Sequence, residues 1–156
     1  LYVAGLGQGS GRALHAADDL TCFEATQYAA REAYGMASLG PDDIQFAEVH
    51  DCFSITEMVT MEDLYLSSEG NVIKDVMDGV FDSDGKIPCQ IDGGLKCFGH
   101  PVGASGIRML YEMYLQLQGR AGERQLPNPK TGLIHNLGGQ PSQNVCAVSI
   151  VGLEGV

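Results

Sequence analysis

The stretch that most constrains the fold is Phe46–Phe53, where an extended apolar segment runs directly into a helical pattern. Residues 44–49 have the composition of a short buried strand. The strand ends in His50, Asp51 and Cys52, and the apolar residues that follow recur with helical spacing. Side chains two positions apart on an extended segment share a face. We therefore expect an imidazole and a thiol to face one cleft at the carboxyl end of a strand.

The rest of the chain alternates between strand and helix patterns. Strands are expected over residues 1–7, 44–49, 132–136 and 144–151, and helices over residues 20–36, 53–66, 72–80 and 107–117. A polar connection is expected over residues 9–19. This order is typical of an α/β fold in which a mixed sheet carries helices on its faces. A length of 156 residues suits one domain.

Composition narrows the possible partners and the compartment. The formal net charge is −11 with nine Lys and Arg, which is a poor basis for tracking a phosphate backbone, so nucleic acid is not an expected partner. Five cysteines are an odd number without a framework spacing, which favours a reducing, cytoplasmic compartment. No segment has the ~20 apolar residues of a membrane span. Because Leu1 opens a strand pattern without a Met, we expect a fragment.

A glycine-rich segment over residues 93–106 is the second informative stretch. It contains His100 followed by Pro101, and it leads into a helical pattern over residues 107–117. Apolar residues surround most of that helix, which is typical of a buried one. Small residues let a backbone or a ligand approach its first turn closely. Gly119 is the expected carboxyl-terminal cap.

Cys52 and His100 are the two groups most suited to chemistry. A free cysteine most often packs as a small hydrophobe, and this reading of Cys52 stays open on composition alone. Its place ahead of a helix favours the other reading, since a helix amino terminus stabilises thiolate. His100 lies among glycines that give no packing reason for a polar ring. Helix N–H groups nearby suit an anion or an oxyanion.

Two metal-site readings compete with this one. His50-x-Cys52 and Cys97-x-x-His100 together offer a ligand set that zinc accepts, but neither spacing matches a usual zinc finger. The acidic turn over residues 82–85 resembles part of a calcium loop but lacks its closing glutamate. We therefore expect no metal site.

Three motifs together resemble the C-terminal half of thiolases. They are Val49–Phe53 (VHDCF), Gly99–Gly106 (GHPVGASG) and Asn136–Gly139 (NLGG). The chain is most similar to the sterol-carrier-protein type and to its archaeal and bacterial relatives, which carry His-Asp-Cys-Phe where better-known thiolases have Asn-Glu-Ala-Phe. The resemblance covers residues 1–152. It implies that residues 1–156 form one thiolase C-terminal domain, a layered α-β-α unit with a mixed five-stranded sheet, and that the N-terminal half with the nucleophilic cysteine is absent.

The resemblance also implies roles for four residues. His100 would activate the nucleophile and help to bind the thioester oxygen, and His50 would complete that first oxyanion hole, directly or through water. Cys52 would be the acid/base thiol at the α-carbon of an acyl-CoA. Gly138 would offer its N–H to a second oxyanion hole. Asn136 stands where many thiolases have a second catalytic cysteine, a departure that favours Cys52 for the acid/base role.

The function implied is acyl transfer: condensation of two acetyl-CoA molecules or thiolytic cleavage of 3-ketoacyl-CoA. The coenzyme A thioester is then a substrate, and no cofactor is expected. Within the same fold, the rivals are an acyl-CoA retro-aldolase and a non-catalytic scaffold subunit. The resemblance implies a homo-oligomer, the missing half and a zinc-ribbon/OB-fold protein as partners. The fragment alone is expected to be inactive.

Overall fold

The computed structural model describes residues 1–11, 20–140 and 143–153. In chain order the elements are β1 (Tyr2–Ser10), α1 (Glu24–Ala37), η1 (Pro41–Asp43), β2 (Phe46–Glu48), α2 (Ser54–Asp63), α3 (Val72–Met77), α4 (Gly94–Phe98), α5 (Ser105–Leu117), η2 (Gly122–Arg124), β3 (Thr131–Gly138) and β4 (Val145–Gly152). Most of the connection expected over residues 9–19 lies outside the described residues. None of the described helices is long and apolar enough to cross a membrane.

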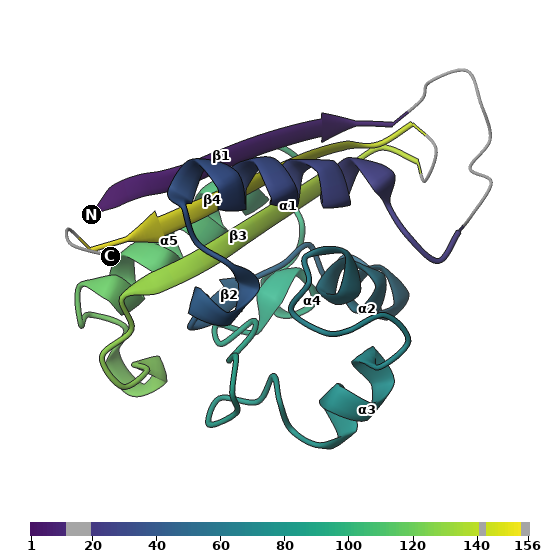
Figure 1. Cartoon of the computed structure of the whole chain (residues 1–156). Coiled ribbons are helices and arrows are strands. Elements are labelled where there is room, and N and C mark those ends of the chain that lie inside the picture. The colour runs from purple at the N-terminus through teal and green to yellow at the C-terminus, as the bar shows by residue number, and fades with distance from the viewer. Residues whose placement is uncertain (12–19, 141–142, 154–156) are drawn as a thin grey trace.

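The strands form a mixed sheet in the order β1-β4-β3-β2 (Figure 1). β4 pairs antiparallel with both β1 and β3, whereas β2 runs parallel to β3. Because β2 and β3 are parallel, their carboxyl ends reach the same edge of the sheet. This is where an α/β fold places a ligand.

The described part of the chain has four strands, so the expectation of five was wrong in that detail. Beyond β2, the chain makes one isolated bridge, between Ala47 and Cys89. Pro88, next to it, has no N–H to donate, and Gln90 has a positive φ of 56°. A ladder therefore cannot extend along this edge, and the segment stays a single bridge.

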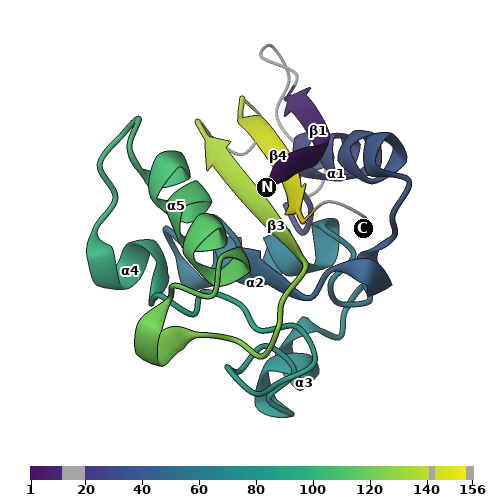
Figure 2. The same cartoon turned by 90° about the vertical axis from the view of Figure 1, so that its left-hand side faces the viewer.

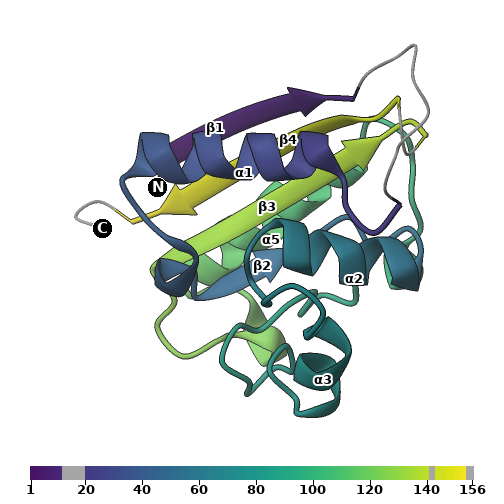
Figure 3. The same ribbon diagram turned by 45° about the vertical axis from the view of Figure 1, so that its right-hand side comes forward.

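Helices cover both faces of the sheet, as expected for a layered α-β-α unit. α1 and α2 lie on one face (Figure 3), and α5 lies on the other (Figure 2). Each face has its own buried core. The first joins Ala29 and Leu64 to Val148 and Ile150, and the second gathers around Met109 and Met113 of α5.

Alternate glycines on β1 let α1 lie directly on the strand. A β-carbon at Gly5, Gly7 or Gly9 would overlap a backbone carbonyl oxygen of α1, on Ala33, Ala29 or Ala25 respectively. The strand therefore continues to Ser10, three residues beyond the expected end at Gly7. In the sequence these glycines look like the start of a flexible connection; in the fold they permit close contact between a strand and a helix.

α5 is buried on one side only. Met109, Met113 and Leu117 are buried in the core. The opposite side carries an apolar stripe that we call the α5 stripe: Ile107, Leu110, Tyr111 and Tyr114, with exposed fractions of 39% to 67%. The helix is apolar on all sides because one side packs in the core and the other is an apolar face that nothing covers in the described chain.

Candidate active site

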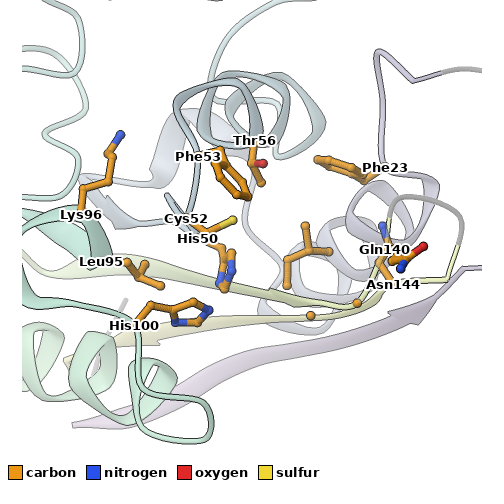
Figure 4. A pocket seen from close by; sticks show the side chains of 13 residues that line it. Phe23, His50, Cys52, Phe53, Thr56, Leu95, Lys96, His100, Gln140 and Asn144 are labelled. Atoms are coloured by element: carbon orange, nitrogen blue, oxygen red, sulfur yellow. The ribbon is translucent and has the colours of Figure 1, made fainter.

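A pocket of about 500 Å³ opens at the carboxyl ends of β2 and β3. Its walls come from the β2–α2 junction, the α4 segment, the residue before α1 and the turn after β3 (Figure 4). Its lining includes all four residues singled out in the sequence: His50, Cys52, His100 and Gly138. Residues 88 positions apart in the chain are thus brought to one cavity by the parallel arrangement of two strands.

The His50 and His100 rings are in contact. Their centroids are 4.8 Å apart and the rings meet edge to face at 82°. His50 is buried, with 4% of its surface exposed, whereas His100 is exposed. Burial lowers the pKa of His50 below its ordinary value, because a buried imidazolium loses its hydration. His50 is therefore a neutral ring at neutral pH, suited to hydrogen bonding.

Asn136 is the side-chain partner of His50. Its Oδ1 atom lies 3.1 Å from His50 Nδ1, and its Nδ2 atom donates to the Met109 sulfur at 3.4 Å. In the sequence Asn136 stood out as the first residue of the NLGG motif and as a departure from the common thiolase pattern. The structure adds that this amide bridges β3, α5 and the strand end that carries His50.

Ser105 holds the other histidine. Its hydroxyl lies 2.7 Å from His100 Nδ1, and Ser105 is itself buried as the first residue of α5. Gly103, with a positive φ of 84°, lets the chain turn back tightly enough for this contact. The bond engages Nδ1 and leaves Nε2 of His100 for the pocket.

The Asp51 side chain does not line the pocket; its carboxylate binds backbone N–H groups instead. It is 1% exposed, and its carboxylate accepts hydrogen bonds from the N–H groups of Leu95 at 2.7 Å and Lys96 at 3.4 Å. These are the first turn of α4, the helix that leads into His100. The carboxylate thus caps a helix amino terminus, where its negative charge is favoured.

His135 is a fully buried histidine that the sequence did not mark as a site residue. Its Nδ1 atom accepts from the backbone N–H of His50 at 3.4 Å, and its Nε2 atom lies 3.2 Å from the Thr26 hydroxyl. Burial lowers the pKa of His135 to about 3, so the ring is neutral. It connects α1, β3 and the strand end of His50 beneath the pocket floor.

Buried ionisable side chains link α5 to β2 and α4. The Arg108 guanidinium pairs with Asp92 and lies 3.4 Å from Glu48 and 5.3 Å from the Phe98 ring centre. Glu48 is 1% exposed, and burial raises its pKa to about 8 although Arg108 acts in the opposite direction. The network fixes the helix whose first turn holds His100.

Cys52 lines the pocket with its side chain partly buried, two residues ahead of α2. Figure 4 shows its sulfur beside the His50 ring. Cys146, by contrast, is fully buried in the core on β4, as expected. Over residues 1–11, 20–140 and 143–153, no three His, Cys, Asp or Glu side chains are arranged to hold a metal ion.

Comparison with known proteins identifies the family. The family described as "Thiolase C-terminal domain-like" matches residues 7–150. The chain is 46% identical over 140 residues to the "Acetyl-CoA acetyltransferase" of Methanothermobacter thermautotrophicus, covering 89% of this chain and 37% of that protein. It is 43% identical over 116 residues to human "Sterol carrier protein 2", covering 74% of this chain and 21% of that protein.

A solved structure shares the fold. A chain of the "Ltp2-ChsH2(DUF35) aldolase" superposes with a TM-score of 0.81 at 20% identity, covering 98% of this chain and 39% of that one. This chain therefore spans between about a fifth and two fifths of the length of the proteins that it matches. The family match over nearly the whole sequence, with the layered fold and the two histidine motifs at one pocket, shows that the chain belongs to the thiolase C-terminal domain-like family.

Proposed function

We propose that the chain is the C-terminal half of a thiolase that acts on acyl-CoA thioesters, by condensing two acetyl-CoA molecules or by thiolytic cleavage of 3-ketoacyl-CoA. One observation carries the proposal: His50 and His100 lie with ring centroids 4.8 Å apart at a pocket that Cys52 also lines. The 46% identity to a protein named acetyl-CoA acetyltransferase supports acyl transfer involving acetyl-CoA.

In this proposal Cys52 is the acid/base. Its thiolate takes a proton from the α-carbon of an acyl-CoA, and the resulting enolate attacks the acyl group on a cysteine of the missing half. The new C–C bond forms as the acyl–sulfur bond breaks, and that cysteine leaves as a thiolate. Thiolysis runs the same steps in reverse, with the Cys52 thiol returning the proton. A thiol suits this step because the same group can take a proton from carbon in one direction and return it in the other.

The histidines and Gly138 are proposed to bind developing negative charge. His100, with Ser105 at Nδ1, presents Nε2 to the pocket for activating the nucleophile and then for holding the thioester oxygen. His50 lies beside it in the same oxyanion hole. The N–H of Gly138, at the end of β3, is proposed to serve a second one. Removing one such donor generally costs about 10²–10³ in rate.

The test is proton exchange at the α-carbon of acetyl-CoA. The upstream half is supplied as the corresponding part of the Methanothermobacter relative, and Cys52→Ser is compared with Cys97→Ser, an exposed cysteine that does not line the pocket. We expect Cys52→Ser to abolish exchange while acylation of the upstream cysteine persists. The Cys97 variant should exchange normally. Normal exchange in Cys52→Ser would refute the acid/base role.

An acyl-CoA retro-aldolase is the alternative within the fold. The aldolase that shares the fold is only 20% identical, so the similarity shows a common fold and does not support a common reaction. A retro-aldolase cleaves a β-hydroxyacyl thioester without an acyl-enzyme. Formation of a covalent acyl adduct from acetyl-CoA in the assembled protein would therefore favour the thiolase, and aldol cleavage without an adduct would favour the alternative.

The missing half and further copies are the proposed protein partners. The α5 stripe, which nothing covers in the described chain, is the proposed contact surface for such a partner. A scaffold subunit, the third possibility, would bind such a partner without turnover. No bound cofactor is needed for the proposed reaction, and coenzyme A enters only as part of the substrate.

A further inference from the structure

The orientation of the Asn136 amide is set by Met109 of α5. The amide nitrogen of Asn136 lies 3.4 Å from the Met109 sulfur. A thioether can accept a hydrogen bond but has no hydrogen to donate. The NH₂ group must therefore face Met109, which turns the carbonyl oxygen towards His50. Gly106 makes room for this arrangement, since a β-carbon there would lie 2.6 Å from Asn136 Nδ2.

The amide orientation decides the histidine tautomer. Asn136 Oδ1 lies 3.1 Å from His50 Nδ1, and a carbonyl oxygen only accepts. We propose that Asn136 is a positioning residue that keeps the hydrogen of neutral His50 on Nδ1, so that Nε2 meets the pocket as a bare hydrogen-bond acceptor. The state of one ring nitrogen is commonly set by the partner of the other.

The backbone of His50 is held in place by a second buried histidine. The His50 N–H donates to Nδ1 of buried His135, whose Nε2–H is then left to donate to the Thr26 hydroxyl. Burial keeps His50 neutral, so a second hydrogen on Nε2 is disfavoured. These contacts involve β3, α1 and α5 and do not depend on any bound substrate.

If the proposed function holds, an Nε2 atom without a hydrogen limits how His50 can stabilise an oxyanion. The nitrogen cannot donate to the oxyanion itself. It can accept one O–H of a water molecule, whose other O–H then points at the oxyanion. Of the two routes open to His50, direct or through water, the geometry points to water.

The tautomer is measurable on this chain by two-bond ¹H–¹⁵N correlation NMR of the ¹⁵N-labelled protein above pH 8, where histidine is neutral. His50 is assigned by the loss of its signals in His50→Gln. We expect its Nε2 to show the downfield shift of an unprotonated nitrogen and its Nδ1 the upfield shift of a protonated one. A protonated Nε2 in the unsubstituted chain would overturn the proposal.

Variants test whether Asn136 is the cause. Asn136→Ala should move the downfield shift from Nε2 to Nδ1, because free histidine favours hydrogen on Nε2. Asn136→Asp keeps an acceptor of the same size and should keep the original pattern, and the remote Asn71→Ala on the α3 side should leave it unchanged. An unaltered tautomer in folded Asn136→Ala would overturn the assignment.

The tautomer can be determined even if one variant is unstable, and independently of the proposed function. If Asn136→Ala does not fold, the unsubstituted spectrum and that of Asn136→Asp decide, since both retain the acceptor. In that case a neutral His50 with hydrogen on Nε2 and none on Nδ1, in either spectrum, refutes the proposal. Failure of the proposed function would appear in the Cys52 exchange experiment and would leave these shifts as they are.

Discussion

Asp51 Oδ1 and the backbone N–H of Leu95 are joined by a 2.7 Å hydrogen bond, which ties the strand end carrying His50 to the helix leading into His100. The two residues are 44 positions apart, and both are buried. One carboxylate therefore links the segment that carries His50 to the segment that carries His100. It also explains why an acid stands between His50 and Cys52 although its side chain does not face the pocket.

Replacing Asp51 with Ala should lower the free energy of unfolding by about 1–3 kcal/mol, because buried N–H groups of α4 lose their acceptor. Asp51→Asn, which keeps one oxygen, should lose less. Urea unfolding measures both, with Asp42→Ala as a matched control on an exposed acid that should change the value by less than about 0.5 kcal/mol. An Asp51→Ala loss as small as that of the control would contradict the capping role.

Gly7→Ala should destabilise the chain by more than the about 1–3 kcal/mol of ordinary overpacking, since its β-carbon would overlap the Ala29 carbonyl oxygen on α1. Gly35→Ala is the matched control, because nothing lies within 4 Å of a β-carbon there and the position is inside α1. That change should stabilise by up to about 1 kcal/mol. Equal thermal midpoints for the two variants would rule out the close contact.

Stability should fall with acid because of His135. Its pKa is about 3 in the folded chain against an ordinary 6.5, so between these values the unfolded chain holds one more proton. The contribution of His135 to the unfolding free energy should therefore drop by about 1.4 kcal/mol per pH unit below pH 6.5. Glu48, with its pKa raised to about 8, contributes in the opposite direction.

Comparing the unsubstituted chain with His135→Gln isolates the pH dependence that His135 adds to the unfolding free energy, since Glu48 contributes equally to both. Urea unfolding between pH 5 and 7 measures the two curves. The difference in stability should shrink steadily as the pH falls. A constant difference across this range would mean that His135 is not held neutral.

The α5 stripe should bind a hydrophobic dye or a second copy when the chain is alone, because its side chains have no cover in the described fold. Ile107→Lys with Tyr111→Lys should reduce dye fluorescence and shift the chain towards monomer. Met77→Lys, an exposed apolar residue on α3, serves as the control and should change little. A monodisperse chain without dye binding before substitution would contradict the expectation.

His100→Ala should slow acylation of the upstream cysteine by about 10²–10⁴, the range of general acid–base catalysis. Ser105→Ala should slow it less, since Ser105 orients the ring through Nδ1 and does not itself reach the substrate. Rapid-quench measurement of acyl-enzyme in the protein assembled with its upstream half gives both rates. An unchanged rate in His100→Ala would refute its assignment as the activating base.

Local sequence patterns predicted the longer helices and the strands because each carries a periodicity that short-range physics imposes. The α5 pattern was predicted over residues 107–117 and is observed at Ser105–Leu117. β1 was predicted too short because Gly7 and Gly9 resemble a connection unless their contact with α1 is known. α4 was missed because a five-residue helix has almost no periodicity, and its cap comes from Asp51, distant in sequence.

The sequence alone determined which groups the protein has for chemistry: a strand that ends in His50 and Cys52, a His100 among glycines, and an apolar helix beyond it. Only the tertiary structure decided which of them meet and in what state. Asn136 faces His50, His135 is neutral, and one side of α5 remains uncovered because strands and helices far apart in sequence pack together. Periodicity is a local property, whereas hydrogen-bond partners and burial are set by long-range packing.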